Sequence, residues 1–203
     1  YGEFVLDARI RSAGLLAQLG EVDAALSKLQ MLLEQGVNGE RNIQIYLAQG
    51  EVLRNAQREK DAMAIYNQAL EQAPTNTDLL YARALTAERL DMLELTESDL
   101  LKVLRHEPNN ANALNALGYT LADRTSRLQE AKEYILKAAQ LLPDDPAILD
   151  SLGWVYYRLG EYEKAIKWLS KAFNKMQDAE IAAHLGEVLW VSGQLDDAKK
   201  IWQ

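Results

Sequence analysis

The chain of 203 residues contains no cysteine, only four prolines and only two phenylalanines. The absence of cysteine excludes disulfides, thiolate metal sites and thiol nucleophiles, and it is compatible with either redox compartment. Basic residues are in deficit, because 22 Lys and Arg stand against 30 Asp and Glu, which gives a formal net charge of -8. This balance opposes the attraction to phosphate that dominates nucleic-acid binding, so we expect no nucleic-acid partner.

Long apolar runs are also missing. The apolar residues lie in amphipathic stretches interrupted by charge, and none approaches the ~20 residues of a membrane span. The composition, 48% hydrophobic and 26% charged, is typical of a folded chain and excludes disorder as an account of function. The chain starts at Tyr1 in the middle of a pattern, without a signal peptide or a lipid-attachment cysteine. We therefore expect it to be part of a longer protein.

Small residues recur along the chain at nearly fixed intervals. The spacings are 37, 34, 34, 35 and 33 residues, between Ala13, Gly50, Ala84, Gly118, Gly153 and Gly186. A period of this length is typical of stacked helix pairs, in which each repeat contacts only its neighbours. The pattern therefore predicts an elongated array that presents a binding surface.

Further positions follow the same period when the small residue is placed at repeat position 8. Position 20, where the two helices of a repeat approach most closely, holds Ala25, Ala62, Thr96, Ala165 and Ala198, with Ala131 displaced by one residue. Position 24 holds the large residues Leu29, Tyr66, Leu100, Ile135, Leu169 and Trp202. These residues are the predicted core between the paired helices.

Prolines and short polar residues mark the boundaries between repeats. Second helices are expected to end at Pro74, Pro108 and Pro143, because proline disfavours helix in the residue before it. The residues that follow, 75–77, 109–110 and 144–145, are short and polar and can cap the next helix. Within repeats, Gly20, Gly160 and Gly193 mark the turns between helices, where a left-handed backbone suits glycine.

The segment LGWVYYRLGEYEKAIKWLSKA at 152–172 carries the pattern of the tetratricopeptide repeat family, which the whole chain resembles. The resemblance implies an all-α fold, a right-handed superhelical solenoid of about six antiparallel helix pairs, forming a single array over residues 1–203. The repeats are expected at about 6–42, 43–76, 77–110, 111–145, 146–178 and 179–203, with the last one truncated. Extra residues between the first two repeats, with Gly36 and Gly39, suggest a bend or hinge.

In such arrays the first helix of each pair lines the concave face, and positions 2, 5, 9, 12 and 13 point inward. The candidate groove residues are Tyr81, Leu85, Asn112, Asn115, Tyr119, Asp150, Trp154, Tyr157, Arg158, Glu187 and Trp190. Aromatic residues of this kind favour a protein or peptide partner. The alternative is that Tyr119, Trp154 and Trp190 only pack between neighbouring first helices.

A captured terminal carboxylate is not expected in this groove. Chaperone-binding members of the family hold such a group with lysines, an arginine and asparagines, and the lysines are missing here. Arg158 could still pair with a partner carboxylate, but an arginine in this place is more often satisfied by its own neighbours. The acidic residues between Glu88 and Asp99 are interpreted as a solvated helix face.

Catalysis is not expected. His106 and His184 lie in different repeats, outside any metal-binding spacing, and no glycine-rich phosphate loop is present. The carboxylates are numerous, but an open array has few closed clefts of the kind that shift carboxylate pKa values for acid–base catalysis. We therefore predict a non-catalytic scaffold with no cofactor, no metal and no catalytic residue.

A closer resemblance is carried by ALNALGYTLADRT at 113–125, EAKEYILKAAQLLPDDPAILDSLGWVYYRLGEYEKAI at 130–166 and AAHLGEVLW at 182–190. These segments resemble the bacterial tetratricopeptide lipoproteins that partner a carboxyl-terminal processing protease. The resemblance implies a periplasmic adaptor, anchored to the outer membrane in the full-length protein, that binds the protease and substrates such as cell-wall hydrolases. The alternative is a general envelope assembly factor or pilotin-like scaffold with another client.

The end of the sequence suggests self-association. We expect the array to continue beyond Gln203, since no capping helix follows the last repeat. Leu195, Ile201 and Trp202 would then be exposed, which predicts end-to-end contact between molecules.

Overall fold

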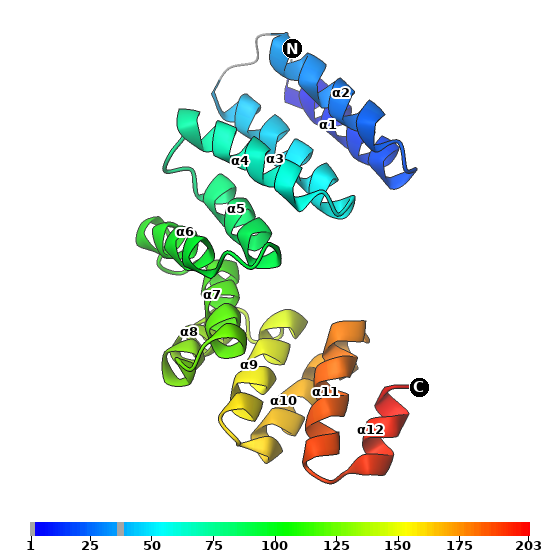
Figure 1. The fold of residues 1–203 in the computed structure, drawn as a ribbon, viewed down its shortest axis with the longest axis vertical. Helices are drawn as coiled ribbons and strands as arrows, with labels where there is room; N and C mark the ends of the chain where they lie inside the picture. Colours follow the sequence, from blue (N-terminus) through cyan, green and yellow to red (C-terminus); the bar gives the residue numbers. More distant parts are fainter. Residues whose placement is uncertain (1–2, 36–38) are drawn as a thin grey trace. The chain divides into compact units, whose positions relative to one another are not determined.

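The computed structural model describes residues 3–35 and 39–203, which form twelve α-helices and no strand within these ranges (Figure 1). The helices are α1 (Glu3–Gln18), α2 (Val22–Glu34), α3 (Glu40–Asn55), α4 (Glu59–Gln72), α5 (Thr77–Arg89), α6 (Leu93–His106), α7 (Ala111–Arg124), α8 (Leu128–Leu141), α9 (Pro146–Arg158), α10 (Tyr162–Lys175), α11 (Ala179–Val191) and α12 (Leu195–Ile201). The predicted all-α class and the succession of six helix pairs are confirmed.

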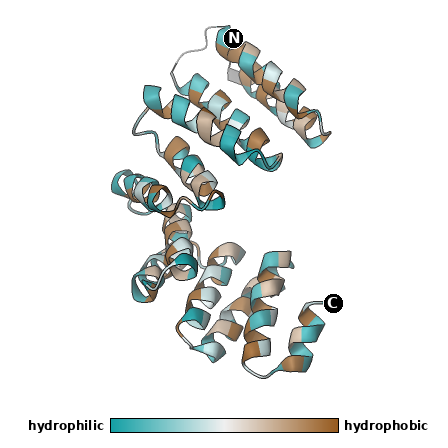
Figure 2. Ribbon diagram, viewed as in Figure 1, coloured by the Kyte–Doolittle hydropathy of each residue, from teal (hydrophilic) through white to brown (hydrophobic). Residues whose placement is uncertain are grey.

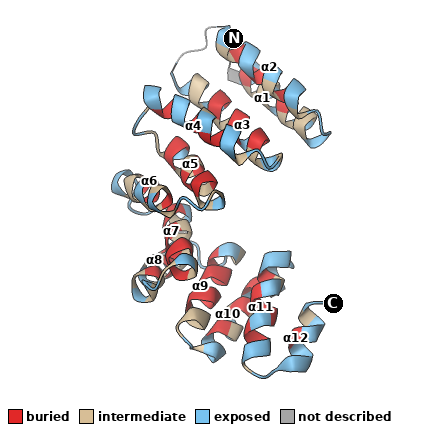
Figure 3. Cartoon of the chain, viewed as in Figure 1, coloured by how far each residue is buried: buried red, intermediate tan, exposed pale blue. Residues whose placement is uncertain are grey.

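The chain divides into two compact units, residues 1–102 and 103–203, with the boundary inside α6. In the amino-terminal unit α1 packs on α2 and α3 packs on α4, and in the carboxyl-terminal unit α7 packs on α8, α9 on α10 and α11 on α12. Apolar and polar residues alternate around most helices (Figure 2), and the buried residues lie along their packed sides (Figure 3). Each unit therefore builds its core from amphipathic helices.

The residues at position 24 pack against the small residue at position 8 in each glycine-containing repeat. A Cβ atom added to the glycine would collide with the large residue of the second helix in the pairs Gly50–Tyr66, Gly118–Ile135, Gly153–Leu169 and Gly186–Trp202. The position 20 residues Ala25, Ala62, Thr96, Ala131, Ala165 and Ala198 are all buried. Glycine at these four positions therefore lets a large residue of the second helix fill the space that a side chain would occupy.

The predicted helix starts are confirmed for four repeats, at Thr77, Ala111, Pro146 and Ala179. In all four the preceding side chain caps the helix. Asn76, Asn110 and Asp145 each accept a hydrogen bond from the backbone N–H three residues later, at 2.9–3.0 Å, and Asp178 accepts one from Glu180 N–H at 2.8 Å.

The second repeat begins earlier than predicted. Helix α3 starts at Glu40 rather than at residue 43, directly after Gly39, whose φ of 63° suits glycine. The carboxylate of Glu40 in the first turn is favoured by the helix dipole. Gly36 lies outside the described residues, so the hinge stays a prediction.

The turns within repeats use a left-handed residue more widely than expected. Gly20, Gly160 and Gly193 have φ values of 77° to 87°, which confirms the prediction, but Gln57 (φ 58°) and Asp91 (φ 61°) adopt the same region. The turn geometry is therefore set by the packing of the two helices and is kept where glycine is absent.

At the end of the last repeat, Leu195 and Trp202 are exposed, with 43% and 50% of their surface accessible. The expectation for Ile201 was wrong, because this residue is half-buried against the cluster of Leu185, Leu189 and Ala198. Self-association through this end stays a prediction.

Candidate functional site

The first helices of the last three repeats, α7, α9 and α11, lie side by side in the carboxyl-terminal unit. They carry nine of the candidate residues, which we call the first-helix face: Asn112, Asn115, Tyr119, Asp150, Trp154, Tyr157, Arg158, Glu187 and Trp190. The two remaining candidates, Tyr81 and Leu85, are half-buried on α5 in the amino-terminal unit. Because they belong to the other compact unit, their place in a shared groove stays a prediction.

A buried polar pair lies at the centre of the first-helix face. His184 Nδ1 is 2.9 Å from Asp150 Oδ2, and the imidazole stacks on the Trp154 ring with 4.2 Å between centroids. The exposed fractions are 5% for Asp150, 8% for Trp154 and 9% for His184. Trp154 and Asp150 therefore offer little area to a partner and instead hold α9 against α11.

The environment of His184 favours its protonated form. Burial opposes protonation, but the hydrogen bond to Asp150 and the negative charges of Asp150, Glu180 and Glu187 outweigh it, so the pKa of His184 is raised. His184 was not predicted as a site residue, because it belongs to no catalytic or metal-binding pattern in the sequence. Its partner lies 34 residues away, one repeat earlier.

Arg158 is satisfied by neighbours of its own chain. Its Nη1 donates to the backbone oxygen of Asp123 at 2.7 Å and lies 3.9 Å from the Asp123 carboxylate, which also accepts from Trp154 Nε1 at 3.3 Å. This arrangement disfavours Arg158 as a receptor for a partner carboxylate. Asp123 was not among the predicted residues, although it occupies position 13 of its repeat and the same position rule includes it.

The exposed part of the first-helix face combines tyrosine hydroxyls with carboxylates. Tyr157 Oη donates to Glu187 Oε1 at 2.8 Å, and Tyr119 Oη donates to Glu180 Oε1 at 3.4 Å. Burial, together with the hydrogen bond to Glu187, raises the pKa of Tyr157 to about 12, and burial and nearby carboxylates also raise the pKa of Tyr119. Both hydroxyls therefore stay protonated and act as donors. Glu180, at position 2 of its repeat, was missed in the same way as Asp123.

Glu187 has aromatic neighbours on two helices. Tyr157 of α9 contacts its carboxylate, and Trp190 lies one turn further along α11, with 47% of its surface exposed and its ring 6.0 Å from that of Trp202. A carboxylate beside exposed aromatic rings attracts a lysine or arginine side chain through both an ion pair and the ring faces. The chemistry of this region therefore suits a cationic segment of a partner.

The two asparagines of α7 differ in accessibility. Asn112 is exposed, whereas Asn115 is half-buried and its Oδ1 has no hydrogen-bond partner among the described residues. A polar partner could use both, and their role in binding stays a prediction.

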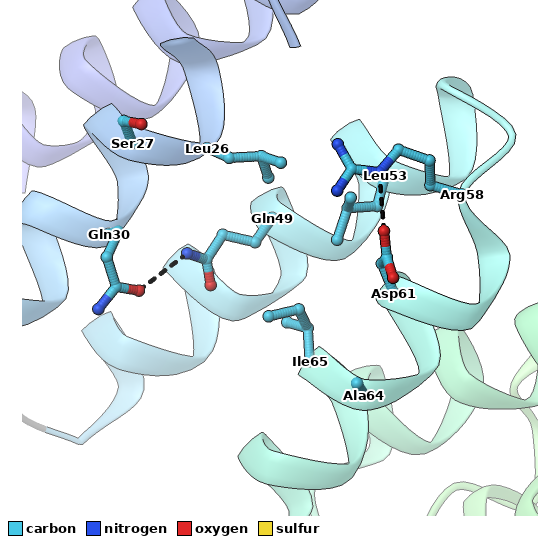
Figure 4. A pocket seen from close by; sticks show the side chains of 9 residues that line it. All are labelled: Leu26, Ser27, Gln30, Gln49, Leu53, Arg58, Asp61, Ala64 and Ile65. Carbon is cyan, nitrogen blue, oxygen red and sulfur yellow. Dashed lines mark hydrogen bonds and ion pairs between the residues drawn. The ribbon is translucent and has the colours of Figure 1, made fainter. Parts of the chain in front are cut away.

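A pocket of about 460 Å³ lies in the amino-terminal unit, between α2, α3 and α4. It is lined by Leu26, Ser27, Gln30, Gln49, Leu53, Arg58, Asp61, Ala64 and Ile65 (Figure 4). Gln49 Nε2 donates to Gln30 Oε1 at 3.4 Å, and Arg58 Nε donates to Asp61 Oδ2 at 2.8 Å. This pocket was not predicted, because the predicted site was confined to the inward-facing positions of the first helices.

The described residues also bear on metal binding and membrane insertion. None of these residues forms a group of three or more His, Asp or Glu able to hold a metal ion. No helix within 3–35 or 39–203 is long and apolar enough to cross a membrane.

The helix pairs form an array of helical repeats, with the exposed aromatic residue Trp190 on the first-helix face. Models of the tetratricopeptide repeat family match residues 10–77, 81–146 and 146–178. The chain therefore belongs to the tetratricopeptide repeat family, whose members generally bind proteins or peptides and typically lack catalytic activity.

Known relatives agree with this assignment. A TPR repeat-containing protein of Pseudomonas aeruginosa is 45% identical over 186 residues, which cover 92% of this chain and 31% of the relative. The chain thus spans about a third of the length of this curated relative.

Solved structures share the fold. A tetratricopeptide repeat protein from Parabacteroides merdae has a TM-score of 0.76 at 15% identity, covering 97% of this chain and 77% of that one. YrrB, a TPR protein with an unusual peptide-binding site, has a TM-score of 0.63 at 24% identity, covering 88% and 90%. At these identities the likeness concerns the fold alone.

Proposed function

We propose that this chain is the protein-binding part of a periplasmic lipoprotein adaptor, which binds a carboxyl-terminal processing protease and its substrates, such as cell-wall hydrolases. The observation that carries the binding role is the exposed contact between Tyr157 and Glu187, beside Trp190, on the first-helix face. Exposed aromatic residues with a polar edge are frequent hot spots of protein interfaces. The choice of a protease as partner is supported by the resemblance of residues 113–125, 130–166 and 182–190 to lipoproteins of that kind.

An adaptor of this type needs no chemistry of its own. If one surface holds the protease and another holds the substrate, cleavage becomes nearly intramolecular and the effective substrate concentration rises. The outer-membrane anchor belongs to the full-length protein and would confine this reaction to the periplasm. The chain alone should therefore show no hydrolase activity and should accelerate cleavage by its protease.

The test is affinity capture from an envelope extract, with the wild-type chain as bait beside a Tyr157→Ala, Trp190→Ala double variant. Trp154 is left intact because its buried stack with His184 supports the fold. Phe4→Ala, which removes an aromatic side chain that is 88% exposed on α1, is the matched control. Circular dichroism should show all baits equally helical.

We expect wild type and Phe4→Ala to recover a carboxyl-terminal processing protease or its hydrolase substrates, and the double variant to lose them. Purified protease should then cleave its substrate faster when the chain is added. Recovery of secretion or assembly components without a protease would instead favour the general envelope or pilotin-like scaffold. Absence of both binding and acceleration would refute the adaptor role for this part of the protein.

A further inference from the structure

Gln49 occupies a position that the later repeats fill with leucine. Position 7 of the last three repeats holds Leu117, Leu152 and Leu185, each with no more than 2% of its surface exposed. Gln49 is nearly as buried, at 3%, and its Oε1 has no hydrogen-bond partner in the described part of the chain. An unsatisfied buried acceptor destabilises a fold, so stability alone would favour leucine at residue 49.

A polar residue at position 7 is not in itself unusual in this chain, because the third repeat has Arg83 there. The Arg83 guanidinium is fully engaged, with Nε and Nη2 donating to the carboxylate of Asp99 at 2.6 and 3.0 Å and Nη1 donating to Asn67 Oδ1 at 2.8 Å. Gln49 has only the long contact from its Nε2 to Gln30. The distinguishing feature of Gln49 is therefore its unused acceptor.

The Gln49 side chain lines the pocket between α2, α3 and α4, and its Oε1 is buried in the wall. Figure 4 shows the Gln49 amide reaching into the space between Gln30 and Ile65, with Leu26 and Leu53 beside it. Leu53 is buried, and Leu26 and Ile65 are half-buried. The volume of about 460 Å³ falls in the range of pockets that hold side chains or small ligands, ~300–1,000 Å³.

The charges that line the pocket are already paired. Arg58 donates to Asp61 at 2.8 Å and, through Nη1, to Asp23 Oδ1 at 2.9 Å. An ionic ligand would have to break these contacts or bury its own charge, which is costly. A ligand that matches the pocket is therefore neutral, largely apolar and equipped with one donor.

We propose that this pocket binds a tryptophan side chain of a partner protein, with the indole N–H donating to Gln49 Oε1. Indole is a donor only, so its burial leaves no acceptor unsatisfied, and its ring supplies a large apolar area for Leu26, Leu53 and Ile65. Asparagine and glutamine would bury an additional carbonyl acceptor, and tyrosine would bury a hydroxyl oxygen that is also an acceptor, so each of them would leave an acceptor without a donor. Tryptophan is also the residue type most enriched among interface anchors.

The proposal goes beyond the adaptor function and does not depend on it. The pocket lies on α2, α3 and α4, and it shares no residue with the first-helix face of α7, α9 and α11. An adaptor that holds two proteins requires two surfaces, and a tryptophan pocket on the amino-terminal unit would be chemically distinct from a face that suits cations.

The first experiment uses the wild-type chain and needs no variant. N-acetyl-L-tryptophanamide is titrated into the chain by calorimetry, and the Gln49 side-chain amide is followed by NMR. The matched probe carries a methyl group on the indole nitrogen and so lacks the donor. We expect the first probe to bind saturably with one-to-one stoichiometry and to shift the Gln49 resonance. The methylated probe should bind about tenfold more weakly, because it cannot form the hydrogen bond to the buried Gln49 acceptor.

The second experiment separates binding from folding. Gln49→Leu removes the acceptor and introduces the leucine that the later repeats have at position 7. We therefore expect a higher unfolding temperature together with about tenfold weaker probe binding. Gln129→Leu, the same exchange at an exposed site of α8, should leave binding unchanged.

Three results would overturn the proposal. These are the absence of saturable binding, equal affinity for both probes, and binding that Gln49→Leu leaves intact, which would place the probe elsewhere. None of these measurements involves the protease, so failure here leaves the adaptor function untouched, and failure to capture a protease leaves this proposal untouched.

Discussion

Gly118 lies so close to the second helix of its repeat that a Cβ atom at this residue would come 2.9 Å from the backbone oxygen of Ala131 and 2.5 Å from Cγ1 of Ile135. At Gly153 the closest contact, also 2.5 Å, is to the side chain of Leu169, which can change its rotamer. The backbone of Ala131 moves only if α8 moves. The two glycines therefore differ in how much of the repeat must shift to admit a side chain.

Gly118→Ala should destabilise the chain more than Gly153→Ala does. Overpacking costs about 1–3 kcal/mol, and the contact with the Ala131 backbone places Gly118 in the upper part of this range, at about 2–3 kcal/mol. The better helix propensity of alanine offsets ~1 kcal/mol, so we expect a net loss of about 1–2 kcal/mol at Gly118. A methyl group at Gly14 in α1 would have nothing within 4 Å of it, so Gly14→Ala should raise stability. Urea unfolding followed by circular dichroism measures all three, and a neutral Gly118→Ala would contradict the close-packing argument.

His184 should make stability depend on pH. Its pKa is raised in the folded chain above the ordinary value of about 6.5, so protonation favours the folded state. This stabilisation is fully present below about pH 6.5 and is lost as the pH rises through the folded pKa. The difference in unfolding temperature between wild type and His184→Gln should therefore be largest in mildly acidic buffer and shrink towards alkaline pH.

The control for this titration is His106→Gln, which removes the exposed histidine near the end of α6. Asp150→Asn should reproduce the loss of pH dependence seen in His184→Gln, because it removes the closest negative charge. A difference between wild type and His184→Gln that grows with pH would show that the histidine is held neutral.

Much of the fold could be predicted because each repeat is a local structure. The contact between Gly153 and Leu169 joins residues 16 positions apart, and the caps at Asn76 and Asn110 act over three residues, so spacing and residue type suffice. Gln57 shows the limit of this approach. Its left-handed backbone is imposed by helix packing, and its side chain gives no sign of it.

The candidate site was less predictable because its contacts join different repeats. The position rule selected Tyr157 and Glu187, which do meet, but it could not show that His184 at position 6 would reach Asp150 one repeat earlier. Such pairs depend on the offset between neighbouring first helices, which the sequence period alone does not specify. The pocket around Gln49 was missed for a related reason, since its walls come from two repeats.

Gln57→Gly should stabilise the turn between α3 and α4. The left-handed conformation of Gln57 costs about 1–2 kcal/mol of folding free energy because of its Cβ atom, and glycine avoids this cost. Part of the gain is offset, because glycine raises the conformational entropy of the unfolded chain. Asp91→Gly at the equivalent turn should gain less, because aspartate tolerates this conformation better. Thermal unfolding compares the two, and equal or negative shifts would argue against strain at Gln57.

The buried ion pair of the third repeat should be sensitive to the loss of one partner. Asp99 was expected on a solvated helix face, and this expectation was wrong, because Asp99 is fully buried and is held by Arg83, with Lys102 Nζ at 3.1 Å. Arg83→Leu would leave the carboxylate with Lys102 alone, and breaking a buried pair in this way costs about 3–5 kcal/mol.

Replacing both members of this pair should restore stability. Leucine is the residue of the later repeats at position 7, and the second repeat has Ile65 where the third has Asp99. The double variant Arg83→Leu, Asp99→Ile should therefore be as stable as wild type or more so, because no charge remains buried. The midpoints of denaturant unfolding compare wild type, Arg83→Leu and the double variant. A double variant less stable than Arg83→Leu would show that the ion pair is needed for the fold.

The first-helix face should bind its partner through the charge of Glu187. Because this carboxylate is exposed beside Tyr157 and Trp190, we expect Glu187→Lys to weaken capture of the partner recovered by the wild-type chain at least tenfold, through repulsion of a cationic segment. Glu163→Lys, the same charge change at an exposed site of α10, should have little effect. Binding measured at rising salt should weaken for wild type and change less for Glu187→Gln, since screening acts on the charge that this variant lacks. A partner that binds Glu187→Lys as tightly as wild type must be recognised by other groups, and the aromatic residues would then act without the carboxylate.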